Sequence, residues 1–259
     1  MNNNKNNNKE SVSDLSKNKI KWIRSLHHKK TRDELGFFIV EGEKMVNEAL
    51  IYAENFIELL AYTNDFRHEN LSVESYEISA KELDQISLLT TPNKVLAVIR
   101  KKKTNSTIQQ DNLILALDGI QDPGNLGTIM RIADWYGISD IICSKTTVDW
   151  YNPKVVQASM GAIFRVNMHS LELESWLREC KLNIYGALLE GINIYKETLQ
   201  GTGVLLLGNE GNGISKELLP LISHPISIPR FGGAESLNVS AAAAILVSEF
   251  KRIEFQKQK

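Results

Sequence analysis

The sequence predicts an α/β protein in which a mostly parallel sheet is preceded by a smaller α/β domain. Short, wholly apolar runs such as 113–117 and 204–207 alternate with segments of helical spacing. A strand that is apolar throughout is buried on both faces, which is typical of a parallel sheet covered by helices on each side. One polar segment without periodicity, residues 101–112, interrupts the alternation and indicates a linker between two domains.

The N-terminal part of the chain predicts a short tail followed by the smaller domain. Residues 1–16 are rich in Asn, Lys and Ser and have too few apolar groups to offset the entropy of ordering, so we expect a disordered tail. Residues 17–103 are expected to form the small α/β domain, and residues 104–112 the linker. Apolar runs predict strands at 37–40, 56–62 and 95–99, and helical spacing predicts helices at 44–52 and 80–89.

Residues 113–259 predict the larger domain. Ligands of open parallel sheets bind beyond the carboxyl ends of the strands, so the loops that follow strands are where we expect chemistry. Strands are expected at 113–117, 141–143, 184–189, 204–207 and 226–228, and helices at 124–136, 153–164, 173–180, 216–222 and 237–255.

Composition excludes several classes of protein. No run of about 18 apolar residues occurs, which argues against a membrane span. The polar N-terminus lacks the apolar core of a secretion signal, so the cytoplasm is the expected compartment. Cys143 and Cys180 lie too far apart in sequence to indicate a disulfide framework or a CxxC metal site.

The charge of the chain is unevenly distributed. The formal net charge is only −1, yet residues 17–32 hold seven Lys and Arg residues and no acid. Such a cluster can bind phosphates, or it can be an ordinary solvated helix face. The seven are Lys17, Lys19, Lys21, Arg24, Lys29, Lys30 and Arg32.

The first segment that departs from the ordinary α/β pattern follows the strand at 113–117. Gly124 and Gly127 allow a tight turn and a close backbone approach. Asn125 is a candidate cap for the helix that follows. Arg131 lies six residues further on and can point back toward the loop, or it can be a surface ion-pair partner.

The second segment follows the strand at 204–207. Gly208, Gly211 and Gly213 expose backbone amides and carbonyls that suit a polar cofactor. Their spacing is neither the GxGxxG pattern nor a Gly-Lys-Ser/Thr phosphate loop. Ser215 is expected to cap a helix.

The third segment follows the strand at 226–228. A proline and a glycine loop lead to a helix that starts near Ser236. Helix capping accounts for either Ser236 or Asn238 but not for both.

Taken in order, the three segments resemble the three motifs of the SpoU (TrmH) family of RNA 2′-O-ribose methyltransferases. The resemblance rests on residues 125–131 (NLGTIMR), 207–215 (LGNEGNGIS), 228–229 (IP) and 236–240 (SLNVS), and on the connecting segment 152–162. Residues 38–42 (FIVEG) and 96–98 (LAV) are similar to the L30e-like substrate-binding domain of many members.

The resemblance implies a fold, a cofactor and a set of site residues. The catalytic domain would contain a deep trefoil knot, work as a homodimer, and use S-adenosyl-L-methionine without a metal. By motif position, Gly208, Ile228 and Leu237 would bind the cofactor, while Arg131, Asn125, Glu210, Ser236 and Asn238 would form the catalytic site. Lys29, Lys30 and Arg32 are then candidate RNA contacts.

The chemistry of these residue types fits that assignment. A ribose hydroxyl is a poor nucleophile until its proton is shared or removed, and the remaining requirement is alignment with the methyl donor. Because arginine stays protonated, Arg131 is better suited to clamp a phosphate or ribose than to act as the general base for which the family is known. Asn238 and Ser236 can orient the hydroxyl, and Glu210 can position Arg131 or the substrate.

Three other functions remain open at this point. The extra N-terminal domain favours 23S ribosomal RNA as the substrate, but transfer RNA is the alternative. A non-catalytic RNA-binding assembly factor would carry the same fold. A nucleotide-dependent oxidoreductase is disfavoured because the GxGxxG pattern is missing.

Overall fold

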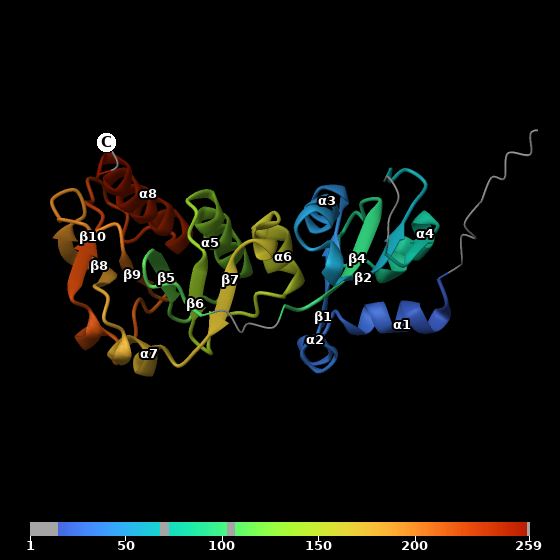
Figure 1. Ribbon diagram of the computed structural model, residues 1–259, viewed down its shortest axis with the longest axis horizontal. Coiled ribbons are helices and arrows are strands. Elements are labelled where there is room, and N and C mark those ends of the chain that lie inside the picture. Colours follow the sequence, from blue (N-terminus) through green and yellow to red (C-terminus); the bar gives the residue numbers. More distant parts are fainter. Residues whose placement is uncertain (1–14, 68–72, 103–106, 258–259) are drawn as a thin grey trace, which may run out of the picture. The chain divides into compact units, whose positions relative to one another are not determined.

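The computed structural model describes residues 15–67, 73–102 and 107–257. The chain divides into two compact units, Met1–Lys102 and Lys103–Lys259, and each unit has its own sheet (Figure 1). Among the described residues no helix combines the length and apolarity needed to span a membrane. Most of the expected tail, residues 1–14, and linker residues 104–106 lie outside the described residues.

The end of the expected tail is ordered, which corrects the sequence prediction. Leu15 is buried in the core of the N-terminal unit. Ser16 is the N-cap of the first helix, and its Oγ accepts a hydrogen bond from the Lys19 amide at 3.3 Å. An apolar anchor and a capping hydroxyl are therefore enough to fix the chain two residues before the helix.

The N-terminal unit is a four-stranded mixed sheet with helices packed against it. The strand order is β1-β4-β2-β3, in which β4 runs antiparallel to both β1 and β2, and β3 is parallel to β2. The elements are α1 (Lys17–Ser25), α2 (Lys29–Leu35), β1 (Phe37–Glu41), α3 (Glu43–Tyr52), β2 (Ile57–Tyr62), β3 (Ser75–Glu77), α4 (Ala80–Ile86) and β4 (Val95–Arg100).

The C-terminal unit contains a six-stranded sheet in which every neighbouring pair of strands is parallel. The strand order is β10-β8-β9-β5-β6-β7. The strands are β5 (Leu113–Leu117), β6 (Asp140–Cys143), β7 (Asn167–Ser170), β8 (Ile184–Asn193), β9 (Gly203–Leu207) and β10 (His224–Ser227). Leu117 is in register with Leu207, so the loops after β5 and β9 leave the sheet side by side.

Helices cover both faces of this sheet. α5 (Pro123–Trp135) packs against α6 (Pro153–Ser159) and against α8 (Val239–Lys257) on one face, whereas α7 (Leu173–Glu179) lies on the other (Figure 1). Leu173 and Leu177 of α7 join a core cluster with Ile114 and Val204 of the central strands. Gly127 brings α5 very close to α6, because a Cβ at this position would lie 2.5 Å from Ala158 Cβ.

The α/β class and the parallel sheet are confirmed, and several expected boundaries are wrong. The helix expected at 153–164 ends at Ser159, because Met160 and Gly161 have φ values of 49° and 91°. No helix spans 216–222, where turns lead into a short 3-10 segment around Pro220; a proline lacks an amide donor and disfavours helix in the residue before it. β3 and β7 were not expected, because both carry polar residues and lie at sheet edges.

Candidate active site

The three segments singled out in the sequence meet at one edge of the parallel sheet. The loop 118–122 follows β5, the loop 208–215 follows β9, and the loop 228–238 follows β10. Because all six strands run in one direction, their carboxyl ends lie along the same edge. Side chains that are up to 113 residues apart in sequence are thereby brought into contact.

Glu210 joins the second loop to the first. Its Oε1 accepts hydrogen bonds from the Asp122 amide at 3.2 Å and from Asn125 Nδ2 at 3.1 Å. Its Oε2 accepts from the Gln121 amide at 3.2 Å. The expectation that Glu210 positions Arg131 gains no support from these contacts, since the carboxylate instead orders the entry to α5.

The same contacts set the ionisation of Glu210. Partial burial acts to raise the pKa of the carboxyl group, but the hydrogen bonds from Asn125 and from the amides of Gln121 and Asp122 outweigh it. The pKa of Glu210 is therefore below its usual range, and the group is held as a carboxylate.

Asn125 and Asn238 join the first loop to the third. Asn238 Nδ2 donates to Asn125 Oδ1 at 2.9 Å, so Asn125 bridges Asn238 and Glu210. Asn238 is also the cap of α8, since its Oδ1 accepts from the amides of Ser240 at 2.9 Å and Ala241 at 3.4 Å. Asn125 does not cap α5, as the sequence suggested; Asp122 does, accepting from the Asn125 amide at 2.8 Å.

Gly208 begins a very tight turn. The amides and carbonyls of Asn209 and Gly213 hydrogen-bond to each other at 2.9 and 3.0 Å. A Cβ on Gly208 would lie 2.2 Å from the Gly213 carbonyl carbon and from the Ile214 nitrogen. Within the turn, the Asn209 side-chain oxygen accepts hydrogen bonds from the amides of Gly211 and Asn212. Its side-chain nitrogen donates to the Gly119 carbonyl at 2.6 Å.

Asp118 closes the other side of this turn. Its carboxylate is 8% exposed and accepts hydrogen bonds from both the amide and the hydroxyl of Ser215. Ser215 was expected to cap a helix, and this was wrong: it anchors the end of the loop to the residue after β5.

The other expected site residues make no side-chain hydrogen bond to this network among the described residues. Arg131 is exposed on α5 and makes no ion pair or side-chain hydrogen bond with any other described residue. Ser236 is exposed and, within the described part of the chain, has no side-chain hydrogen bond, so capping accounts for Asn238 alone. Ile228 is half-buried after β10, and Leu237 is 50% exposed.

The three residues expected to contact RNA differ in their exposure, and the expectation was wrong for Arg32, which is buried. Its side chain is 2% exposed, and Nη1 donates to the carbonyls of Leu26 at 3.0 Å and His27 at 2.9 Å, so it joins α1 to α2 instead of facing solvent. Lys29 and Lys30 are exposed but lie 2.5 and 3.8 Å from acids one turn away. The acids are Asp33 and Glu34.

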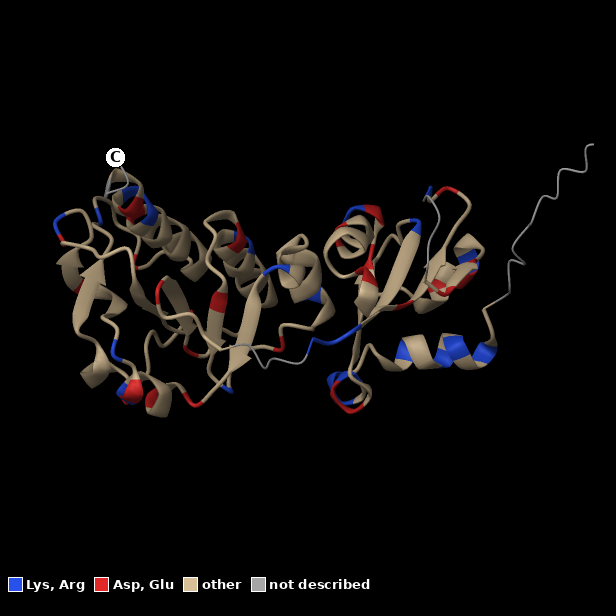
Figure 2. Ribbon diagram, in the orientation of Figure 1, with Lys and Arg blue, Asp and Glu red and all other residues tan. Residues whose placement is uncertain are grey.

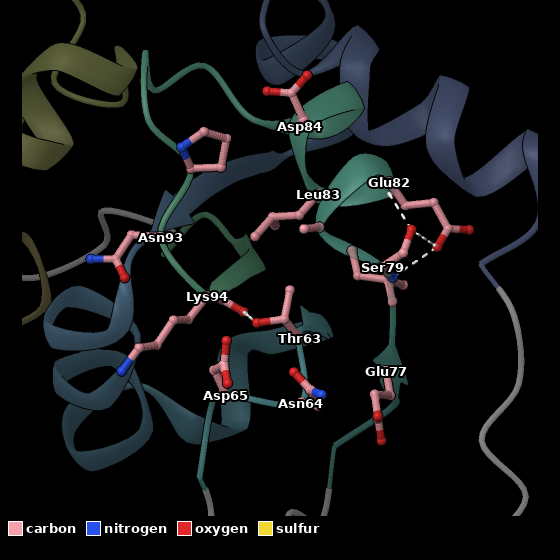
Figure 3. A pocket seen from close by; sticks show the side chains of 13 residues that line it. Thr63, Asn64, Asp65, Glu77, Ser79, Glu82, Leu83, Asp84, Asn93 and Lys94 are labelled. Atoms are coloured by element: carbon pink, nitrogen blue, oxygen red, sulfur yellow. Dashed lines mark hydrogen bonds between the residues drawn. The ribbon is translucent and has the colours of Figure 1, made fainter.

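The N-terminal unit contains a hollow lined by its own residues alone. It has a volume of about 930 Å³ and lies between the start of α4 and the ends of neighbouring strands (Figure 3). Four carboxylates and one ammonium group line it, so it repels phosphates. They belong to Asp65, Glu77, Glu82, Asp84 and Lys94.

Sequence reasoning missed four residues that hold the site together. Gln121 and Asp122 supply amides to Glu210, and Asp118 and Asn209 tie the first two loops together. Asp118 directly follows the buried strand β5, and Asn209 follows the buried strand β9 after a single glycine. This position at the carboxyl end of a strand was the feature of the sequence that could have identified them.

Comparisons with known proteins match each of the two units to a protein family. Residues 112–248 match the SpoU rRNA Methylase family, and residues 17–97 match the MRM3-like substrate binding domain. The chain is 32% identical to a 23S rRNA (guanosine(2553)-2'-O)-methyltransferase, RlmP of Bacillus subtilis, over 88% of this chain and 94% of the relative.

Solved structures of similar proteins cover both units. A putative TrmH-family RNA methyltransferase of Porphyromonas gingivalis is 38% identical, with a TM-score of 0.85 over 93% of this chain and all of the other. An AdoMet-bound rRNA methyltransferase of Sinorhizobium meliloti is 30% identical, with a TM-score of 0.81 over 93% of this chain and 97% of the other. Together with the family match across more than half of its length, these similarities show that the chain belongs to the SpoU rRNA methylase family.

Proposed function

We propose that this protein transfers a methyl group from S-adenosyl-L-methionine to a ribose 2′-hydroxyl of 23S ribosomal RNA. The observation that carries the proposal is the chain of hydrogen bonds from Glu210 through Asn125 to Asn238. It links the three motif loops into one site beside the glycine turn. The 23S assignment is supported by the relatives, which include 23S rRNA 2′-O-methyltransferases from Bacillus subtilis and Neisseria meningitidis.

The loops after β9 and β10 fit the cofactor. Gly208 keeps the turn narrow, and the exposed segment 230–238 offers backbone amides and carbonyls for a polar ligand. Gly208, Ile228 and Leu237 would hold S-adenosylmethionine, which supplies a methyl group already activated by its sulfonium charge. The AdoMet-bound relative from Sinorhizobium meliloti supports this choice.

The protein's own residues would bind and orient the substrate. The side-chain amide nitrogen of Asn238 donates to Asn125, and its oxygen accepts from the first turn of α8. The side chain is therefore held rigidly and would present a fixed face to a ribose. Ser236 has an uncommitted hydroxyl among the described residues and can accept a hydrogen bond from the 2′-hydroxyl or donate one to its oxygen. Arg131, charged and exposed, would clamp the adjacent phosphate.

The finer features of the family form part of the same proposal. We expect the C-terminal unit to contain a deep trefoil knot, the N-terminal unit to be L30e-like, and the active protein to be a cytoplasmic homodimer that needs no metal. The similarity to TrmH-family structures over nearly the whole chain supports the knot and the domain arrangement.

Methyl transfer to separate RNA classes tests the substrate. Purified protein is incubated with methyl-labelled S-adenosylmethionine and either bacterial 23S ribosomal RNA, 16S ribosomal RNA or transfer RNA. Label in the 23S RNA, at a nucleotide that becomes resistant to alkaline cleavage, is expected. Label only in transfer RNA would show that the substrate assignment is wrong.

The Arg131→Ala variant separates an enzyme from an assembly factor. Removal of the clamp should lower kcat/KM by about 100-fold or more, while the melting temperature is unchanged because the side chain is exposed and unpaired with other described residues. Arg178→Ala on α7 is the matched control, since it removes an exposed arginine on the opposite face of the sheet. Equal activity of the two variants would contradict the proposed role.

A further inference from the structure

The first helix of the N-terminal unit has two unlike faces. Ile20 and Ile23 point inward and, together with Leu26, pack on the core of the unit. Trp22 makes an edge-to-face contact with Phe37 at 5.5 Å between ring centroids. The helix is therefore fixed to the unit by one face and presents the other to solvent.

The outward face of α1 carries a row of cations. Lys17, Lys21 and Arg24 are all exposed and are spaced by four and three residues. Residues at these spacings are neighbours on one side of a helix. Figure 2 shows α1 as a helix with several basic residues and no acidic one.

These three cations differ from the other basic residues nearby. Lys19 lies 2.5 Å from Glu74 and sits over the Tyr76 ring at 4.8 Å. In contrast, Lys17, Lys21 and Arg24 form no ion pair with any acid in the described ranges. Among the described cations of the segment 17–32, these three therefore differ from Lys19, Lys29 and Lys30, each of which lies beside an acid.

The N-terminal part of the row opposes the stability of the helix, whereas Arg24 in the last turn is favourable with the helix dipole. Cations in the first turn are unfavourable with the helix dipole, and like charges at four-residue spacing repel. No acid in the first turn of α1 offsets them. Charge placements that destabilise a helix in this way are expected at functional or strained sites.

We propose that the row formed by Lys17, Lys21 and Arg24 binds successive phosphates of the substrate RNA. The proposal rests on the function proposed above and replaces Lys29, Lys30 and Arg32 as the contact residues. The protein as a whole is nearly neutral, and the hollow of the same unit is lined mainly by acids, so attraction for a polyanion is expected from a local cluster of basic residues.

The test compares two triple variants with the same loss of charge. Lys17→Gln, Lys21→Gln and Arg24→Gln together remove the row, and glutamine keeps a helix propensity close to that of lysine. Lys29→Gln, Lys30→Gln and Lys81→Gln form the control, because these lysines are exposed on the same unit but outside the row. Circular dichroism checks that both variants keep their helices.

The measurement is the affinity for transcribed 23S ribosomal RNA at several salt concentrations. Loss of the row should lower the slope of log affinity against log salt by about two to three, since each phosphate contact contributes about 0.7 to 0.9. The affinity at low salt should fall by about tenfold or more. The control variant should keep a slope near that of the wild type.

Three outcomes would overturn the proposal. They are an unchanged slope in the row variant, an equal loss in the control, and a loss of binding to phosphatidylserine vesicles with RNA binding intact. S-adenosylmethionine binding by calorimetry and methyl transfer at saturating RNA are measured in parallel. A wild-type protein that transfers no methyl group to RNA refutes the proposed function, whereas normal transfer with an unchanged slope refutes only the role of the row.

Discussion

The glycine turn after β9 offers a sharp test, because an added Cβ would meet a different environment at each of its three glycines. In Gly208→Ala the new Cβ would lie 2.2 Å from two backbone atoms and 2.5 Å from the Gly213 oxygen. Backbone cannot rotate away as a side chain can, so the turn must open. Overpacking of this kind costs about 1–3 kcal/mol, occasionally more.

Two neighbouring glycines provide graded controls. A Cβ on Gly211 would meet its nearest atom at 3.6 Å, an ordinary contact, so Gly211→Ala should change stability by no more than about 0.5 kcal/mol. Gly213 has open space but a φ of +68°, so Gly213→Ala should cost about 1–2 kcal/mol through backbone strain.

Calorimetric unfolding and S-adenosylmethionine titration measure the series. At about 2–4 °C per kcal/mol for a unit of this size, Gly208→Ala should melt about 2–12 °C lower than the wild type. It should also lose cofactor affinity, because opening the turn displaces Asn209 and Glu210. A Gly208→Ala protein that melts and binds the cofactor like the wild type, or that ranks with Gly211→Ala, would refute the reasoning.

Four further outcomes are expected. Gly127→Ala should destabilise the protein by about 1–3 kcal/mol in urea unfolding, since its Cβ would overlap Ala158 on α6. Glu210→Gln should flatten the acid limb of a stability-against-pH curve: the depressed pKa of Glu210 gives stability that is present above the unfolded pKa and lost as pH falls through the folded pKa. Asp140→Ala should cost about 1–3 kcal/mol, because it leaves the buried His169 ring without its 2.7 Å partner. The buried Cys143 thiol, whose pKa is raised to about 12 by desolvation, should resist a thiol reagent in the native protein and react after denaturation.

The sequence was most informative where a pattern and its burial coincide. The central strands β5 and β9 are apolar at nearly every position and buried throughout, so their strand character and their place in a parallel sheet were predictable. The three motif loops were also predictable, since each follows an expected strand. Two follow the buried strands β5 and β9, and the third follows β10, which is only partly buried. Edge strands β3 and β7 escaped detection because polar residues at a sheet edge leave no apolar run to recognise.

Individual side chains were less predictable than the loops that carry them. Arg32 belongs to a basic segment that reads as one solvent-facing cluster, yet it is buried on the carbonyls of Leu26 and His27. The three unpaired cations of α1 stand out from Lys19 only because β3 and the residue before it bring Tyr76 and Glu74 beside it. Such pairing depends on strands that are distant in sequence.

By itself, the sequence determined the alternation of the main elements and the family, and it indicated which loops form the candidate site, because these depend on local spacing. The tertiary structure alone decided which of those residues touch. Glu210 meets Gln121 across 89 positions of sequence, and Asn238 meets Asn125 across 113. The physical reason is the parallel sheet, because the register of β5 with β9 sets their two loops side by side. The third loop directly precedes α8, and the packing of α8 on α5 brings that loop to the same edge.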